Sequence, residues 1–279
     1  MPEGLEASGL ADTVSAARGA LSCVPAGIVT DFDGTLSPIV SEPDAARPLP
    51  GVATALEALA RRMAVVAVVT GRGALDARER LGAAGALVVG NHGIEWLYPH
   101  QPRPEPAFGQ AAVEERLRAA LSRVVEEAGV KVEYKGMSAT IHYRGARDPA
   151  AARTRLMDAL SGATRDLELR EGRASIELRP LGLGDKGEAL RRIVQLHRLR
   201  GLMVLGDDVT DLDMFRAAAE LRAAGTLSCA LIGAVQGGDE VPAAVQAAAD
   251  LLIGSVEDAA QLLRELATPA SLPGTGLPA

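Results

Sequence analysis

Two aspartates two residues apart, Asp31 and Asp33, follow a short apolar run at residues 26–30. The run predicts a buried strand. Residues two apart on a strand face the same side, so we expect the two carboxylates to lie together. Gly34 then allows a sharp turn. Two close carboxylates need a cation between them or a proton on one of them. The pair suits covalent phosphoryl transfer, with one carboxylate as nucleophile, one as general acid and base, and a divalent metal at the phosphate.

A second acidic cluster lies far along the chain, in segment 206–211. It follows an apolar run at residues 202–205 and carries Asp207, Asp208 and Asp211. Three acids directly after a buried strand are costly unless a cation joins them. A helix N-terminus stabilised by its dipole would explain Asp211 but would leave the other two without a reason.

The two acidic clusters together predict a metal site. Mg²⁺ prefers one or two carboxylates, several waters and phosphate oxygens. Asp31, the backbone carbonyl of Asp33 and the side chain of Asp207 would form such a set. Asp208 and Asp211 would either bind the metal directly or hold the groups that bind it.

Two other segments offer groups that bind phosphate. Thr70, Gly71 and Arg72 follow the apolar run at 63–69 and present a hydroxyl and backbone amides. Lys186 begins a predicted helix that Asp185 would cap. A cation in the first helical turn opposes the helix dipole by about 0.3–1 kcal/mol, which a surface lysine would tolerate. We expect instead that Lys186 neutralises the nucleophile and the transferring phosphoryl group.

The elements that must position these residues alternate along the chain. Strands are predicted at 26–31, 63–69, 86–89, 202–205, 228–232 and 250–253. Helices are predicted near 51–62, 73–82 and 186–198. This alternation indicates an α/β fold with a Rossmann-like parallel sheet, whose sites lie at the carboxyl ends of the strands. The polar clusters follow predicted strands, in agreement with that architecture.

The pattern changes between residues 106 and 179. A proline-rich stretch at 101–106 predicts a stiff linker. The elements expected after it are helix 109–128, strands 130–135 and 138–144, helix 149–161, and strands 165–170 and 174–179. This αββαββ insert predicts an α+β cap domain at 106–179, which would act as a lid. The catalytic core would comprise 1–105 and 180–279, with an N-terminal extension at 1–24 and a flexible tail at 268–279.

Composition narrows the class of protein. The chain has 279 residues, of which 48% are hydrophobic and 23% charged, as in ordinary globular proteins. The net charge of -7 argues against nucleic acid as a partner. No apolar run reaches the length of a membrane span, and the N-terminus lacks the basic region of a signal peptide. Cys23 and Cys229 lie far apart, so we expect two reduced core thiols rather than a disulfide. We therefore expect a cytoplasmic monomer without a membrane partner.

The order of the motifs resembles that of phosphatases of the haloacid dehalogenase (HAD) superfamily. The residues that carry the resemblance are Asp31, Asp33, Thr70, Lys186, Asp207 and Asp208. The second carboxylate is typical of the phosphatase branches, and the position of the insert is similar to the C2B cap class. The resemblance implies that Asp31 attacks phosphorus, that Asp33 moves the proton, and that Mg²⁺ is the cofactor.

Within that class the chain resembles the trehalose-6-phosphate phosphatase family. The similar segments are 90–95, 133–144, 177–180 and 206–211. The resemblance implies that Glu133, Lys135 and Glu177 hydrogen-bond sugar hydroxyls, and that Arg144 lies near the phosphate. The other substrate-binding candidates belong to the loops after the second and third strands: Gly71, Arg72, Asn91 and His92. The implied substrate is trehalose 6-phosphate.

One departure keeps alternatives open. The family usually continues its last motif as Thr-Asp-Glu, and here Leu212 replaces the glutamate. The substrate could instead be sucrose 6-phosphate or mannosyl-3-phosphoglycerate. A phosphotransferase would use the same aspartates with a sugar as acceptor. A non-catalytic sugar-phosphate sensor is a further alternative.

Overall fold

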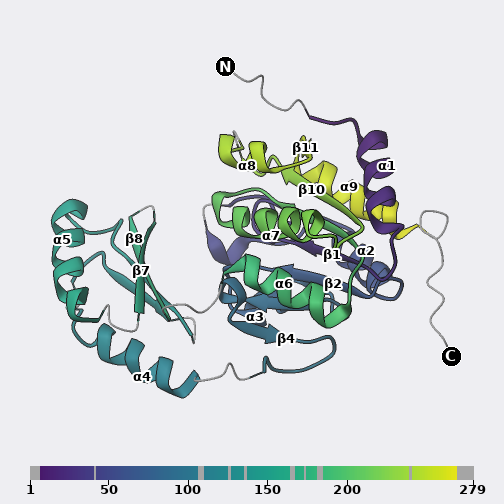
Figure 1. Cartoon of the computed structure of the whole chain (residues 1–279). Coiled ribbons are helices and arrows are strands. Elements are labelled where there is room, and N and C mark those ends of the chain that lie inside the picture. Colours follow the sequence, from purple (N-terminus) through teal and green to yellow (C-terminus); the bar gives the residue numbers. More distant parts are fainter. Residues whose placement is uncertain are drawn as a thin grey trace. The chain divides into compact units, whose positions relative to one another are not determined.

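The computed structural model of the chain describes residues 7–40, 42–105, 110–124, 127–134, 137–163, 167–172, 174–180, 185–238 and 241–268. The chain divides into two compact units. The first comprises residues 1–104 and 185–279, and the second comprises residues 105–184. Each unit has its own sheet, and Figure 1 labels some of the strands of each. The predicted flexible tail falls almost wholly outside the described residues, as does Lys135.

The first unit is built on a seven-stranded sheet in the order β11-β10-β9-β1-β2-β3-β4. Its strands are β1 (Ala26–Thr30), β2 (Val65–Val69), β3 (Leu87–Gly90), β4 (Glu95–Leu97), β9 (Gly201–Gly206), β10 (Cys229–Val235) and β11 (Leu251–Ile253). All neighbours are parallel except β4, which runs antiparallel to β3. The predicted parallel α/β sheet is confirmed. The short antiparallel edge strand β4 was not among the predicted strands.

Helices cover both faces of this sheet. They are α1 (Leu10–Leu21), α2 (Val52–Ala60), α3 (Ala74–Leu81), α6 (Lys186–His197), α7 (Leu212–Ala223), α8 (Ala243–Ala248) and α9 (Val256–Ala267). Side chains of α1, α2, α3 and α9 form one apolar cluster, and those of α6, α7 and α8 form another. Successive strand residues alternate between the clusters, with Ile28 in the first and Val29 in the second. None of the helices in the described ranges is both long enough and apolar enough to cross a membrane.

The two cysteines form a disulfide, so the prediction of two reduced thiols is wrong. Cys23 precedes β1, and Cys229 begins β10, 206 residues further along the chain. The sheet register explains how they meet, because Gly201 of β9 pairs with Ala26 on one side and with Cys229 on the other. The Cα atoms of the two cysteines lie 5.9 Å apart. Because the two cysteines are bonded to each other, they give no support to the predicted cytoplasmic location. That location stays a prediction from the sequence.

The second unit has a four-stranded antiparallel sheet in the order β5-β6-β8-β7. Its elements are α4 (Gln110–Leu121), β5 (Lys131–Tyr134), β6 (Ala139–His142), α5 (Pro149–Leu160), β7 (Leu167–Gly172) and β8 (Ser175–Pro180). Asp148 caps α5 by accepting from the backbone N–H groups of Ala150 and Ala151, and Pro149 opens the helix. The order of the elements is the predicted αββαββ.

Candidate active site

The carboxyl ends of β1 and β9 meet in the middle of the large sheet. From these neighbours the chain moves outward in opposite directions, through β2 and β3 on one side and through β10 and β11 on the other. Such a reversal creates the crevice where open α/β sheets bind ligands. Asp31 follows β1 and donates its backbone N–H to the carbonyl of Leu205 over 3.0 Å. Asp207 follows β9. Both predicted acidic clusters therefore lie at this reversal.

Gly34 brings the loop after β1 close to Asp207. Its φ is +80°, and a Cβ atom at this position would collide with the Asp207 carboxylate. The backbone N–H of Gly34 donates to the carbonyl of Ser37 over 2.7 Å and closes the turn. Thr35 Oγ1 then donates to Asp207 Oδ1 over 3.0 Å. The turn needs glycine both for its left-handed backbone and for the close approach of the carboxylate.

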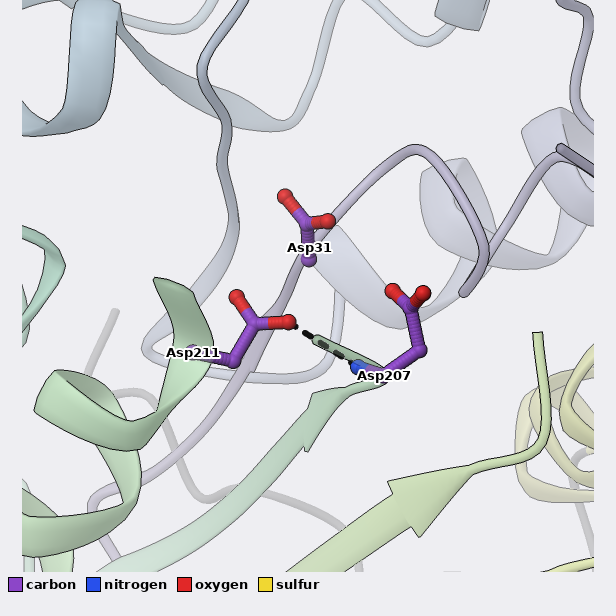
Figure 2. A group of neighbouring side chains, drawn as sticks. All are labelled: Asp31, Asp207 and Asp211. Carbon is purple, nitrogen blue, oxygen red and sulfur yellow. Dashed lines mark hydrogen bonds between the residues drawn. The ribbon is translucent and has the colours of Figure 1, made fainter. Parts of the chain in front are cut away.

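Three buried aspartates form one cluster, drawn in Figure 2. Asp31, Asp207 and Asp211 each offer a carboxylate oxygen, and these oxygens all lie within 4.8 Å of one another. Asp33 and Asp208 are not members of any such group among the described residues. The sequence left open whether Asp208 or Asp211 lies at the metal site. In the structure Asp211 is fully buried in the cluster, and Asp208 is exposed.

Asp211 is held by the backbone of the same loop. Its Oδ2 accepts from the backbone N–H groups of Asp207 and Asp208 over 2.9 and 3.1 Å. Its Oδ1 accepts from Lys186 Nζ over 2.7 Å. Both oxygens are therefore occupied by protein donors, and Asp211 fixes the position of Lys186.

Lys186 connects the two acidic motifs. It is the first residue of α6 and follows the N-cap residue Asp185. The side chain of Asp185 accepts from the backbone N–H of Glu188 over 2.6 Å. Only 2% of the Lys186 side chain is exposed, and its Nζ also donates to Asp31 Oδ1 over 2.7 Å. A lysine on a surface would not be buried between two carboxylates. The structure therefore rules out the surface alternative for this residue.

The surroundings of Asp31, Asp207 and Lys186 shift the pKa of each of these three groups. Burial raises the pKa of Asp31 to about 7, with Lys186 opposing the change and Asp211 adding to it. Burial, Asp31 and Asp211 raise the pKa of Asp207 to about 8. Burial alone would lower the pKa of Lys186, but Asp211 and Asp31 raise it above its usual value. One ammonium group cannot neutralise both carboxylates that share it, so the cluster retains unbalanced negative charge.

This charge and chemistry fit a divalent metal. Three carboxylates and one ammonium leave two net negative charges when all are ionised. The donor set consists of oxygen atoms alone, which suits hard cations. The raised pKa values of Asp31 and Asp207 show that their ionised forms lack sufficient stabilisation from the protein. The buried acidic cluster has the character of a metal site.

Two loops that carry four of the predicted substrate-binding residues lie beside each other, at the ends of β2 and β3. Thr70 follows β2, and its Oγ1 accepts from the backbone N–H of Arg72 over 3.2 Å. The backbone N–H of His92 donates to the Thr70 carbonyl over 2.9 Å, and that of Asn91 donates to the Arg72 carbonyl over 2.8 Å. Gly71 packs against His92, because a Cβ there would lie 2.7 Å from the imidazole. The four predicted substrate-binding residues and Thr70 therefore form one connected pair of loops.

Asn91 has a structural partner that the sequence did not reveal. It is buried, and its side chain hydrogen-bonds Glu95. Glu95 Oε2 in turn accepts from the backbone N–H of Ala74, at the start of α3, over 2.8 Å. Asn91 thereby ties the loop after β3 to the first turn of α3.

Asp33 forms an ion pair with Arg72. Its Oδ2 accepts from Arg72 Nε and its Oδ1 from Arg72 Nη2, each over 2.7 Å. The period of two that would align Asp33 with Asp31 applies only inside a strand, and β1 ends at Thr30. Sequence reasoning found both Asp33 and Arg72 but not their pairing.

The predicted sugar-binding residues belong to the second unit. In its sheet, Glu133 pairs with Thr140, and Thr140 pairs with Glu177, so the three form one row across adjacent strands. Residues opposite each other on neighbouring strands share a face of the sheet. Glu133 Oε2 also lies 3.0 Å from His142 Nε2. Arg144 follows β6 and is exposed.

Leu212, the departure from the family pattern, is a core residue. It begins α7, is only 6% exposed, and belongs to the apolar cluster beneath α6 and α7. At this position the chain therefore buries an apolar side chain directly after the acidic loop at 207–211.

A cavity of about 330 Å³ lies at the amino ends of strands β2 and β3, opposite the candidate site. Its lining includes Val65 and Leu87, the first residues of β2 and β3, together with Tyr98 and His197. It contains none of the predicted site residues. The chemistry-bearing residues are those at the carboxyl ends.

Comparison with known proteins points to one family. The sequence profile of the family described as trehalose-phosphatase matches residues 29–243. A trehalose-phosphate phosphatase of Mycolicibacterium paratuberculosis is 38% identical over 200 residues, which are 67% of this chain and 50% of the relative. The chain spans about half the length of the curated relatives it matches.

Two solved structures share the fold. The C-terminal domain of a C. albicans trehalose-6-phosphate phosphatase gives a TM-score of 0.68 at 21% identity, covering 96% of this chain and 99% of that one. The C-terminal domain of a Candida albicans trehalose synthase regulatory protein gives 0.67 at 11% identity, covering 94% and 99%. At these identities the likeness establishes the fold alone. The predicted HAD-type α/β fold is confirmed.

Proposed function

Because the chain belongs to the trehalose-phosphatase family, we propose that it hydrolyses trehalose 6-phosphate to trehalose and phosphate. The observation that carries the proposal is the contact of Asp31 with Lys186 inside the buried acidic cluster. A nucleophile of this kind needs a cation beside it and a site for a metal. The likeness to a relative named trehalose-phosphate phosphatase supports the choice of sugar.

In the first step, an oxygen of Asp31 attacks phosphorus in line with the bond to the sugar oxygen. The new bond forms an aspartyl-phosphate as the old one breaks, and Asp33 donates a proton to the leaving sugar oxygen. Asp33 then takes a proton from a water molecule that attacks the same phosphorus. Phosphate leaves, and the Asp31 carboxylate is regenerated.

Mg²⁺ is the proposed cofactor. Asp31 and Asp207 would hold it, together with the backbone carbonyl of Asp33, because these groups offer hard oxygen ligands at the cluster. When bound, the ion would neutralise charge on the phosphoryl oxygens. Asp211 is assigned a supporting role, since its two oxygens already accept from Lys186 and from two backbone amides. Asp208 is exposed, and we assign it no ligand role.

Lys186 and Thr70 are proposed to stabilise the transferring group. The Lys186 ammonium already contacts the attacking carboxylate, so it would face the charge that develops on phosphorus oxygens. Thr70 and the amides of the following loop would bind the remaining oxygens.

Recognition of the sugar is assigned to the second unit. Glu133 and Glu177 share one face of its sheet and would accept hydrogen bonds from sugar hydroxyls. Arg144 would contact the phosphate side, and Lys135, which lies outside the described residues, would complete the set. Fixed polar groups discriminate well, because a wrong sugar leaves them unpaired.

A phosphate-release panel with Mg²⁺ tests the proposal. It compares trehalose 6-phosphate, sucrose 6-phosphate, glucose 6-phosphate and mannosyl-3-phosphoglycerate at equal concentrations. We expect the highest kcat/KM on trehalose 6-phosphate. Equal activity on all four would remove the sugar assignment and leave a general phosphatase, whereas no release from any would favour a non-catalytic sensor.

A further inference from the structure

Arg72 binds both carboxylate oxygens of Asp33, the proposed general acid. Arg72 is largely buried, with 14% of its side chain exposed, and its guanidinium lies 5.6 Å above the centre of the Phe32 ring. Its Nε and Nη2 donate to the two oxygens of Asp33. An oxygen that carries a proton for the sugar is no longer a full acceptor for such a donor. Asp33 must therefore give up at least one of these bonds when it acts.

Arg72 has a second carboxylate partner on the other side. Its Nη1 donates to Asp76 Oδ2 over 3.3 Å. Asp76 Oδ1 accepts from Arg80 Nε over 2.7 Å. Residues 72, 76 and 80 are spaced by four, so they follow one face of α3 and its start. Burial alone would raise the pKa of Asp76, but its contacts with Arg80 and Arg72 lower it, so this carboxylate stays ionised.

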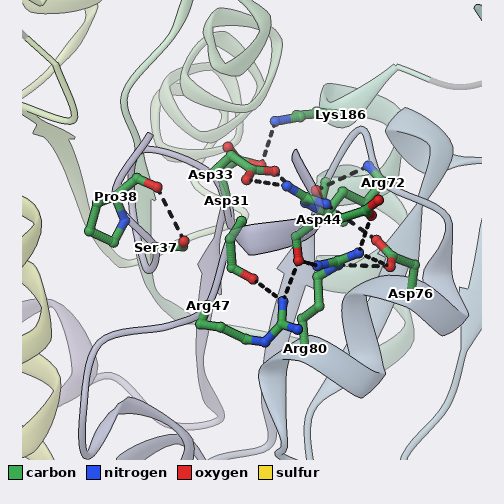
Figure 3. A network of polar contacts seen from close by, with 12 residues as sticks. Asp31, Asp33, Ser37, Pro38, Asp44, Arg47, Arg72, Asp76, Arg80 and Lys186 are labelled. Atoms are coloured by element: carbon green, nitrogen blue, oxygen red, sulfur yellow. Dashed lines mark hydrogen bonds and ion pairs between the residues drawn. The ribbon is translucent and has the colours of Figure 1, made fainter. Parts of the chain in front are cut away.

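Arg80 also binds Asp44, the third acidic residue of this network after Asp33 and Asp76. Its Nη2 donates to Asp44 Oδ1 over 2.9 Å, and its Nη1 donates to the Asp44 carbonyl over 2.6 Å. Only 11% of the Arg80 side chain is exposed. Figure 3 shows the resulting chain of alternating charges, from Asp33 through Arg72, Asp76 and Arg80 to Asp44.

We infer that Asp76, held by Arg80, is a positioning residue that keeps Arg72 in place while Asp33 transfers protons. A guanidinium with a single partner would be left unpaired in a largely buried place when that partner turned away. The second partner removes this cost, because Arg72 keeps one charged contact as Asp33 moves. The inference rests on the proposed function only in giving Asp33 the proton-transfer role.

The kinetic test uses leaving groups of different basicity. A sugar oxygen needs a proton to leave, whereas p-nitrophenolate leaves without one, and kcat/KM reports events up to formation of the aspartyl-phosphate. The variants are Asp76→Asn and its matched control Glu79→Gln, an exposed carboxylate on the same helix. The sugar substrate is whichever sugar phosphate the wild-type protein hydrolyses fastest, so an error in the sugar assignment does not affect the comparison.

For Asp76→Asn we expect kcat/KM on the sugar phosphate to fall about tenfold, and kcat/KM on p-nitrophenyl phosphate to change less than about twofold. Asp76→Glu should restore part of the loss, and Glu79→Gln should behave as the wild type. An equal fall on both substrates would overturn the inference, since it would mean that Asp76 serves phosphate binding or folding. An unchanged sugar phosphate rate would overturn it as well.

A second measurement needs no turnover and therefore separates this inference from the proposed function. The side-chain Nη1–H signal of Arg72 in an NMR spectrum reports whether its guanidinium is held, because Nη1 is the group that donates to Asp76. We expect the signal to persist in Asp33→Ala and to broaden or disappear when Asp76→Asn is added. Loss of the signal in Asp33→Ala alone, with the backbone amide spectrum intact, would show that Asp76 does not hold Arg72.

Discussion

Lys186 Nζ lies 2.7 Å from Oδ1 of Asp31, although 155 residues separate the two in the chain. Both side chains are buried, and the same ammonium also bonds Asp211. This contact joins the loop after β1 to the start of α6, across the point where strand order reverses. Lys186 therefore stabilises the folded structure through its two ion pairs, and it also contacts the proposed nucleophile.

Replacement of Lys186 by methionine should destabilise the protein. Removing one member of a buried ion pair leaves uncompensated charge and costs about 3–5 kcal/mol. Urea unfolding at neutral pH without metal measures the loss. The control is Lys131→Met, because Lys131 is exposed and should contribute less than about 0.5 kcal/mol. Equal stability of the two variants would contradict the role of Lys186 in neutralising the cluster.

Asp207→Asn should stabilise the metal-free protein at alkaline pH. A carboxyl group whose pKa is higher in the folded than in the unfolded state stabilises the fold at low pH, and this contribution is lost as pH rises. For Asp207 the loss runs from an unfolded value of about 4 up to the folded value of about 8. The variant, which cannot ionise, should therefore gain about 1–3 kcal/mol over the wild type at pH 9. Thermal melts in EDTA from pH 4 to pH 9 measure this difference. A gain that is largest at pH 4 would contradict the shift.

Mg²⁺ should raise the melting temperature more at pH 8 than at pH 6. Binding must displace the protons that burial retains on Asp31 and Asp207, so affinity grows as pH rises through their pKa values of about 7 and about 8. At a concentration about 100 times Kd the ion should add about 2.7 kcal/mol. Asp207→Asn should abolish the effect, and Asp208→Asn should keep it, because Asp208 is exposed. EDTA should stop phosphate release, and added Mg²⁺ should restore it.

Loss of the disulfide should lower stability without altering the site. The bond joins residues separated by 206 positions, and removal of a native disulfide typically costs about 2–5 kcal/mol. The double variant Cys23→Ser with Cys229→Ser should melt at the same temperature with and without reductant. The wild type should melt lower when reduced. Uptake of a thiol-alkylating label by the unreduced, denatured wild type would show that the cysteines are free.

Much of the site was predictable because the fold places the carboxyl ends of parallel strands at one edge. Asp31 and Asp207 were expected at the same end of the sheet once each was assigned to the end of a buried strand, and the pairing of β1 with β9 brings them together. Lys186 could be placed beside them from its position at a helix start. The burial of these side chains follows from the central place of β1 and β9 in the sheet.

The remaining features depend on contacts that the sequence does not encode locally. The pairing of Asp33 with Arg72 depends on the turn at Gly34, beyond the end of the strand. The disulfide depends on the register of three strands, which brings together residues that are remote along the chain. The burial of Leu212 depends on how α7 packs. Each of these is a tertiary effect for which spacing gives no signal.

The assignment of Asp31 as nucleophile is tested most directly by comparing the wild type with Asp31→Asn. The measurement is Mg²⁺-dependent release of phosphate and trehalose from trehalose 6-phosphate. The wild type should release the two products in equal amounts, and the variant should be at least about 10³-fold slower, because an amide cannot form the aspartyl-phosphate. Near wild-type turnover by a correctly folded Asp31→Asn protein would contradict it.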